Sequence, residues 1–139
     1  MTKLFLDTNI VIDLLANRKP FCDDAVRLFT MAYNNKVKLI VSPITYTTAS
    51  YLLRKQGSER MRSLLSNLHQ LVQVGTVDQR VINDSLASVF QDFEDAVQYY
   101  TALKSKSAII ITRNGKDFSE SRIPVMTAGE YLASIDDLL

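Results

Sequence analysis

Acidic side chains stand close behind short apolar segments in two distant parts of the chain. Asp7 directly follows residues 4–6, and Asp117 comes shortly after residues 109–111. A third acidic group opens a helix-like segment between them: Asp92, Glu94 and Asp95. Carboxylates gathered at one edge of a fold repel one another unless a cation neutralises them, and all-oxygen ligands select a hard ion such as Mg²⁺ or Mn²⁺. The sequence therefore predicts a divalent-metal site, and such an ion would activate water for phosphodiester hydrolysis.

The third group leaves open which carboxylate belongs to that site. At about 100° per residue, Asp92 and Asp95 lie about 60° apart on one edge of the helix's apolar stripe, and Glu94 lies on the opposite edge. We expect that stripe to consist of Phe93, Ala96, Val97, Tyr100 and Leu103. Asp95 is therefore the inward candidate, with Asp92 or Glu94 as a further ligand. The alternative is that Asp92 and Asp95 form a capping box that only satisfies helix amides.

The other two carboxylates also have plain structural explanations. Asp7 could be a turn residue before the first helix, and Asp117 could serve a turn beside Asn114 and Gly115. Turn chemistry alone does not require acids at all three places, so the joint pattern favours the metal site.

Five strand-like runs alternate with helical segments and must position these carboxylates. The runs are residues 4–6, 38–42, 71–74, 108–111 and 124–126. Helical patterns cover residues 10–15, 21–35, 44–55, 61–68, 78–89, 92–104 and 127–132. Parallel neighbours need crossover helices, so this alternation predicts an α/β fold with a mostly parallel sheet and helices on both faces. Ligands of such sheets bind beyond the carboxyl ends of the strands.

Composition limits the broad class of the protein. A length of 139 residues, with 47% hydrophobic and 22% charged residues, predicts one ordinary globular domain spanning 1–139. The net charge of +1 gives no global attraction for polyanions, so any nucleic-acid binding needs a local basic patch. Cys22 has no partner for a disulfide, and no segment looks like a signal peptide or a membrane span, so we expect a cytoplasmic protein without membrane contact.

Several other functional classes are excluded, and the basic and aromatic residues leave two interpretations. A single His69 and a single Cys22 provide neither a nucleophilic triad nor a zinc site. Arg113 and Lys116 flank the last acidic position and are candidate RNA-binding residues, although each could be an ordinary surface charge. Tyrosines could stack on bases, but at helical spacing they are more often core or dimer contacts: Tyr46, Tyr51, Tyr99 and Tyr100.

Three segments together resemble the PIN domain family. They are Leu-Phe-Leu-Asp7-Thr8-Asn9-Ile-Val-Ile-Asp, Asp92-Phe-Glu-Asp95-Ala, and Ile-Ile-Ile-Thr112-Arg-Asn114-Gly-Lys-Asp117-Phe. The resemblance implies a three-layer α/β/α sandwich and Mg²⁺- or Mn²⁺-dependent endonucleolytic cleavage of RNA, as in the toxins of bacterial toxin–antitoxin pairs. The family's acidic positions match Asp7, Asp95 and Asp117. Its supporting polar positions match Thr8, Asn9, Thr112 and Asn114.

One position departs from the family pattern. The family normally carries a glutamate early in the helix after the second strand, where this chain has Thr48. No aspartate or glutamate occurs from residue 25 to residue 58, so no shift of register restores that acid. Threonine cannot supply a full negative charge, although its hydroxyl could hold water. Either Glu94 or Asp92 compensates, or metal affinity and activity are reduced.

Three functional hypotheses follow. The first is an Mg²⁺- or Mn²⁺-dependent endoribonuclease, with RNA as substrate, an antitoxin protein as a partner and a homodimer as its assembly. The second is a catalytically weakened relative that binds RNA or a protein partner without cutting. The third, a phosphoacceptor domain, would need an acid at the end of a mid-chain strand, and the acid-free stretch through Ser42 argues against it.

Overall fold

A computed structural model describes residues 1–136 of the chain. The last three residues of the predicted single domain, 137–139, lie outside the described part. The strands are β1 (Thr2–Leu6), β2 (Val37–Val41), β3 (Val72–Val74), β4 (Ile109–Ile111) and β5 (Val125–Met126). All five expected strand runs therefore form strands.

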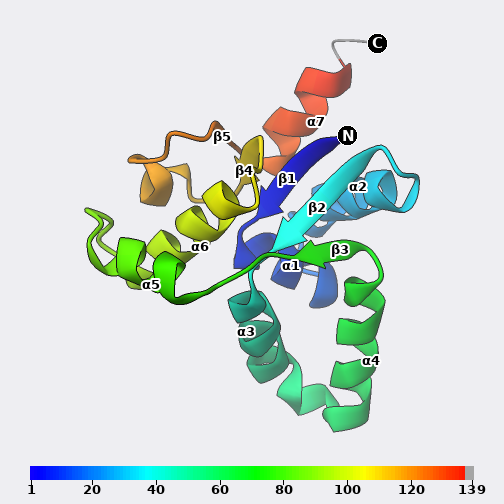
Figure 1. The fold of residues 1–139 in the computed structure, drawn as a ribbon. Helices are drawn as coiled ribbons and strands as arrows, with labels where there is room; N and C mark the ends of the chain where they lie inside the picture. Colours follow the sequence, from blue (N-terminus) through cyan, green and yellow to red (C-terminus); the bar gives the residue numbers. More distant parts are fainter. Residues whose placement is uncertain (137–139) are drawn as a thin grey trace.

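These strands form one parallel sheet in the order β3-β2-β1-β4-β5 (Figure 1). β1 lies at the centre, with β2 on one side and β4 on the other. Leu6 at the end of β1 is in register with Ile111 at the end of β4. The residues that follow these two strands, Asp7 and Thr112, consequently emerge side by side at the carboxyl edge of the sheet.

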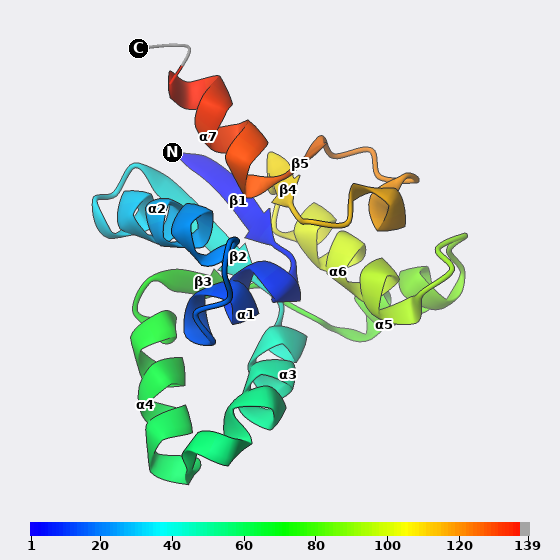
Figure 2. The same ribbon diagram turned by 180° about the vertical axis from the view of Figure 1, so that it is seen from behind.

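Helices connect the strands and follow the expected pattern. They are α1 (Thr8–Leu15), α2 (Cys22–Tyr33), α3 (Pro43–Leu53), α4 (Ser58–His69), α5 (Gln79–Leu86), α6 (Phe93–Lys104) and α7 (Ala128–Asp136). Short 3₁₀ turns are η1 (Arg54–Gln56) and η2 (Gly115–Phe118). α3 and α4 extend away from the sheet as a two-helix arm, which both views show (Figures 1 and 2).

Alternation along the strands divides the core between the two faces of the sheet. One face presents Leu4, Leu6, Leu39, Val41 and Ile111 to residues of α1, α2, α4 and α7. The other presents Phe5, Ile40 and Ile110, which pack with residues of α6 and η2. Because both faces are covered, β4 and the last three residues of β1 and β2 are apolar throughout. The expected three-layer α/β/α sandwich is confirmed.

Local signals in the sequence account for several helix ends. Ser42 caps α3, its Oγ accepting the Ile44 N–H at 3.2 Å, and Pro43 occupies the first turn. Thr127 and Glu130 form a reciprocal capping box at the start of α7, with bonds of 3.0 and 2.8 Å. After α2, Asn35 adopts a left-handed φ of 57°, which ends that helix.

The expected apolar stripe of α6 is partly wrong. Phe93 and Leu103 are 47% and 39% exposed, whereas Gln98 and Thr101 are fully buried. Both buried polar side chains have hydrogen-bond partners, because Gln98 Nε2 donates to Thr8 Oγ1 at 2.7 Å and Thr101 Oγ1 donates to a backbone carbonyl at 2.6 Å. Those bonds offset part of the cost of burying polar groups, although the Gln98 Oε1 has no hydrogen-bond partner among the described residues. Hydrophobicity alone therefore misplaces the buried face. Across residues 1–136, no helix is long and apolar enough to cross a membrane.

Candidate metal centre

Asp7 lies at the point where β1 turns into α1. Its backbone N–H continues the parallel ladder by donating to the Ile111 carbonyl at 2.9 Å. One carboxylate oxygen caps α1, accepting the Thr8 N–H at 2.8 Å, and the other accepts the Thr112 hydroxyl at 2.8 Å. The side chain is only 7% exposed. Asp7 is therefore held in a fixed orientation by groups from both central strands.

Thr112 also connects Asp7 to the loop that carries Asp117. The same Thr112 hydroxyl oxygen accepts the Asn114 N–H at 3.0 Å, and the Asn114 carbonyl accepts the Asp117 N–H at 3.0 Å. Phe118, the next residue in η2, is buried in the core on the α6 side of the sheet. Asp117 itself is exposed on a turn that is fixed at both ends.

The acidic start of α6 faces this turn. Asp92 caps the helix, since its Oδ1 accepts the Asp95 N–H at 3.0 Å. Asp92 therefore does act as a helix cap. Both Asp92 and Asp95 nevertheless face a cleft as well. Asp92, Asp95 and Asp117 line a common cleft of about 280 Å³ together with Lys116 and Glu120. We call it the acidic cleft.

Mutual repulsion is evident in the pKa values of these carboxyl groups. Burial, together with the neighbouring negative charges of Asp92, Asp117, Asp7 and Glu94, raises the pKa of Asp95 to about 7. The pKa of Glu94 is also raised, first by burial and then by Asp92 and Asp7. Five carboxylates from three chain segments therefore act on one another in the same region.

Asp7 shows a balance of opposing effects. Burial raises the pKa of Asp7, and Asp117 adds to that rise, while hydrogen bonds from Thr112, Thr8 and Gln98 lower it. These three hydrogen bonds favour the charged form of the Asp7 carboxylate, which is the form that binds a cation.

The donor chemistry fits a small hard cation. Within residues 1–136, no three acidic, histidine or cysteine side chains are arranged so that they could hold a metal as they stand. The nearby carboxylates are nevertheless oxygen donors with unrelieved repulsion, since their negative charges raise one another's pKa values. Oxygen donors of this kind suit a hard cation such as Mg²⁺ or Mn²⁺.

A buried polar layer lies against Asp7 on the side of α3 and α6. Thr8 Oγ1 lies 2.9 Å from Thr45 Oγ1 and accepts a 2.7 Å bond from Gln98 Nε2. All three side chains are buried. Neither Thr45 nor Gln98 was predicted from the sequence, although a glutamine in the middle of an amphipathic helix was an available signal. Thr48, where the family has glutamate, is half-buried and follows Thr45 by three residues, on the same side of α3.

Arg113, a predicted RNA contact, is engaged within the protein. Its guanidinium pairs with the buried Asp13, with Nε 2.9 Å from Oδ2, and its Cζ lies 3.9 Å from the centre of the Phe21 ring. Arg18 lies 3.8 Å from the same carboxylate. Asp13 is a third residue that was not predicted from the sequence. This arrangement anchors the loop after β4 to α1, while the predicted RNA contact of Arg113 stays untested.

The remaining predicted residues differ in exposure. Lys116 is exposed and lines the acidic cleft. Asn9 is half-buried in the first turn of α1.

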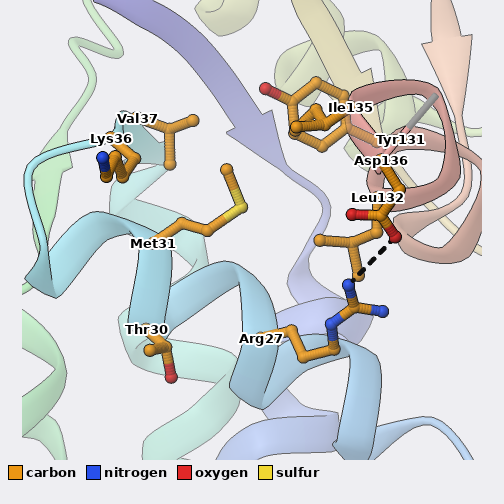
Figure 3. Close-up of a pocket in the computed structure, with 9 residues that line it drawn as sticks. All are labelled: Arg27, Thr30, Met31, Lys36, Val37, Tyr131, Leu132, Ile135 and Asp136. Atoms are coloured by element: carbon orange, nitrogen blue, oxygen red, sulfur yellow. Dashed lines mark hydrogen bonds and ion pairs between the residues drawn. The ribbon is translucent and has the colours of Figure 1, made fainter. Parts of the chain in front are cut away.

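A cavity larger than the acidic cleft lies elsewhere on the protein. It has a volume of about 600 Å³ and opens between α2 and α7, beside Val37 at the amino end of β2 (Figure 3). Met31, Leu132 and Ile135 give it an apolar lining, and Arg27 and Asp136 form an ion pair across one side. Size therefore does not identify the chemical site in this protein.

The parallel sheet, the helices on both faces and the acidic residues at the strand ends define an α/β/α protein with an acidic centre. Residues 3–116 match the PIN domain family, and the chain belongs to that family.

Individual relatives agree with this assignment. The chain is 25% identical over 134 residues to Ribonuclease VapC1 of Aquifex aeolicus, covering 93% of this chain and 92% of the relative. A toxin–antitoxin complex from Klebsiella pneumoniae contains a chain of 27% identity with a TM-score of 0.67, covering 90% of this chain and 97% of that one. VapC20 of Mycobacterium tuberculosis, described as a sarcin-ricin loop cleaving toxin, shares the fold at 16% identity and a TM-score of 0.66, covering 84% and 94% of the two chains.

Proposed function

We propose that this protein is an endoribonuclease that depends on Mg²⁺ or Mn²⁺ held by Asp7, Asp95 and Asp117. The observation that carries the proposal is the electrostatic coupling of these three carboxyl groups at the carboxyl edge of the sheet. Similarity to Ribonuclease VapC1 supports RNA as the substrate. A divalent ion bound there would supply a Lewis acid that activates water and stabilises charge on the phosphate.

The protein's own groups position that chemistry. Thr8 and Thr112 orient the Asp7 carboxylate and favour its charged form. The 112–117 turn sets the place of Asp117, and the cap formed by Asp92 sets the first turn of α6, which carries Asp95. Lys116 at the acidic cleft offers a positive charge to a phosphate that would otherwise be repelled by the surrounding carboxylates.

A second candidate function is binding without cleavage, and one observation favours it. Thr48 leaves α3 without a carboxylate, and the described residues lack a preformed ligand set. Glu94 is the residue best placed to compensate, because both Asp7 and Asp92 influence its pKa.

We further propose that the protein is the toxin of a toxin–antitoxin pair and forms a homodimer. The structure from Klebsiella pneumoniae that shares its fold at 27% identity is described as a toxin–antitoxin complex, which supports this proposal. Co-purification with the product of a neighbouring small reading frame would test the partner, and sedimentation of the isolated protein would test the dimer.

Cleavage of single-stranded RNA separates the two candidate functions. With added Mg²⁺ or Mn²⁺, the natural protein should cut RNA, EDTA should stop the reaction, and Asp7→Asn should lower the rate by at least about 100-fold. Glu59→Gln is the matched control, because it removes one exposed carboxylate on α4. If the natural protein and Asp7→Asn bind RNA equally well and neither cuts it, the second candidate function, RNA binding without cleavage, is correct.

A further inference from the structure

A second cleft adjoins the acidic cleft and is lined mainly by aromatic and apolar side chains. It has a volume of about 490 Å³, and its wall includes Phe90, Tyr99, Tyr100, Leu103 and Arg122. We call it the aromatic cleft. Val89, Phe90 and Glu120 line both clefts, so the two hollows are neighbours along one surface. A chain bound at the carboxylates therefore has a path into the aromatic cleft.

The aromatic wall is rigid. Phe90 packs against Tyr99 with 5.1 Å between ring centroids, and Tyr99 packs edge-on against Tyr100 at 5.0 Å. Tyr99 is only 4% exposed, and its hydroxyl accepts the Arg122 N–H at 3.1 Å. Tyr100 and Phe90 are half-buried, so part of each ring faces solvent. Rings fixed in this way can stack on a base with little loss of side-chain entropy.

Charge around the cleft suits a phosphate next to that base. The side chain of Arg122 is exposed and forms no ion pair with any residue between 1 and 136. On the other side of the shared wall, Lys116 lines the acidic cleft. These two cations lie on either side of Phe90 and Glu120, which matches a backbone that runs from one cleft to the other.

We propose that the aromatic cleft is a nucleobase subsite, in which a base of single-stranded RNA next to the cleaved phosphate stacks on Tyr100 and Phe90. Arg122 binds the phosphate flanking that base. The subsite rests on the proposed ribonuclease function and adds to it a requirement for an unpaired base, because a base inside a duplex cannot enter such a cleft. The competing occupant is a second copy of the chain, since Leu86 and Val89 nearby are also exposed.

Binding of a short single-stranded RNA that contains 2-aminopurine tests the subsite without relying on cleavage. In an Asp7→Asn background, the fluorescence should be quenched on binding. Tyr100→Ala should weaken affinity roughly 5- to 100-fold, the range expected for one lost base–aromatic stack, while Tyr100→Phe should stay within about twofold. Tyr33→Ala removes an exposed tyrosine on α2 and should change nothing.

Arg122→Gln provides a variant that leaves the packed rings in place. It should weaken RNA binding and reduce the slope of log affinity against log salt by about one. Unchanged affinity in both Arg122→Gln and a folded Tyr100→Ala would overturn the subsite. If the natural protein is a dimer, and Tyr100→Ala dissociates it without lowering RNA affinity, the aromatic cleft binds a second copy of the chain instead of a base. If RNA affinity falls in Tyr100→Ala but the natural protein cuts no RNA, the proposed ribonuclease function is refuted and the proposed base-binding subsite is supported.

Discussion

Gln98 Nε2 donates a 2.7 Å hydrogen bond to Thr8 Oγ1 across 90 residues of sequence. Because Thr8 Oγ1 also lies 2.9 Å from Thr45 Oγ1, the pair joins the starts of α1 and α3 to the middle of α6. The Gln98 amide also lowers the pKa of the neighbouring Asp7. This buried layer connects α6, which carries Asp95, to the start of α1, which directly follows Asp7.

Removing the Gln98 amide should weaken metal binding. Gln98→Met keeps the length of the side chain but cannot donate to Thr8 or favour the charged form of Asp7. We expect Mn²⁺ affinity, measured by calorimetry, to fall by about 10-fold, as is typical when a group that orients a metal ligand is lost. Gln79→Met, on the exposed face of α5, is the control. A folded Gln98→Met protein with unchanged Mn²⁺ affinity would show that the layer is only structural.

Thr112→Val should affect both stability and catalysis. The substitution preserves shape but removes the bond to Asp7 and leaves the Asn114 N–H without its acceptor. We expect a loss of about 1–3 kcal/mol in the free energy of unfolding and at least a 10-fold slower cleavage. Thr101→Val, which removes a buried hydroxyl that bonds within α6, should cost less and leave the cleavage rate unchanged. Equal effects of the two variants would argue against a special role of Thr112.

Thr48→Glu should strengthen the centre. The added carboxylate would lie on the side of α3 that faces Thr8, three residues after Thr45, and would supply the charge that the family places there. Tighter Mn²⁺ binding and faster cleavage are the expected results. Thr47→Glu adds the same charge at a neighbouring exposed position of α3 and should do neither. The prediction fails if both variants behave alike.

Stability of the metal-free protein should depend on the ionisation of Asp95. Its pKa is raised from 3.8 to about 7 on folding, so between these values the unfolded state releases a proton that the folded state keeps. The stabilising effect is complete below the lower value and is lost as pH rises through the upper one. Asp95→Asn should therefore match the natural protein near pH 4 and melt a few degrees higher near pH 8, the effect being limited by solvent screening. Identical melting curves at both pH values would contradict the predicted coupling.

The fold could be predicted from the sequence, because short β-branched runs indicate buried strands and helical periodicity indicates the buried faces of helices. Ile109–Ile111 is the clearest example, since a strand covered on both faces must be apolar throughout. The buried face of α6 could not be predicted in this way. Its burial depends on the bond between Gln98 and Thr8, which joins residues 90 positions apart in the sequence.

The position of Asp7 at the edge of the sheet could also be predicted, because parallel strands place their carboxyl ends at one edge. Asp7 and Thr112 lie side by side for this reason. The ion pair of Asp13 with Arg113 was hidden, since a buried charge pair looks the same in sequence as two surface charges. The metal-ligand roles of Asp7, Asp95 and Asp117 stay predictions.

The most direct test of the central claim is an anomalous-difference map from crystals of this protein soaked in Mn²⁺. The account predicts a peak at the carboxyl edge of the sheet, within bonding distance of carboxylate oxygens from Asp7, Asp95 and Asp117, and its disappearance in Asp7→Asn crystals. A Mn²⁺ peak elsewhere, or an acidic cleft that stays empty while Mn²⁺ is bound at another place, would contradict it.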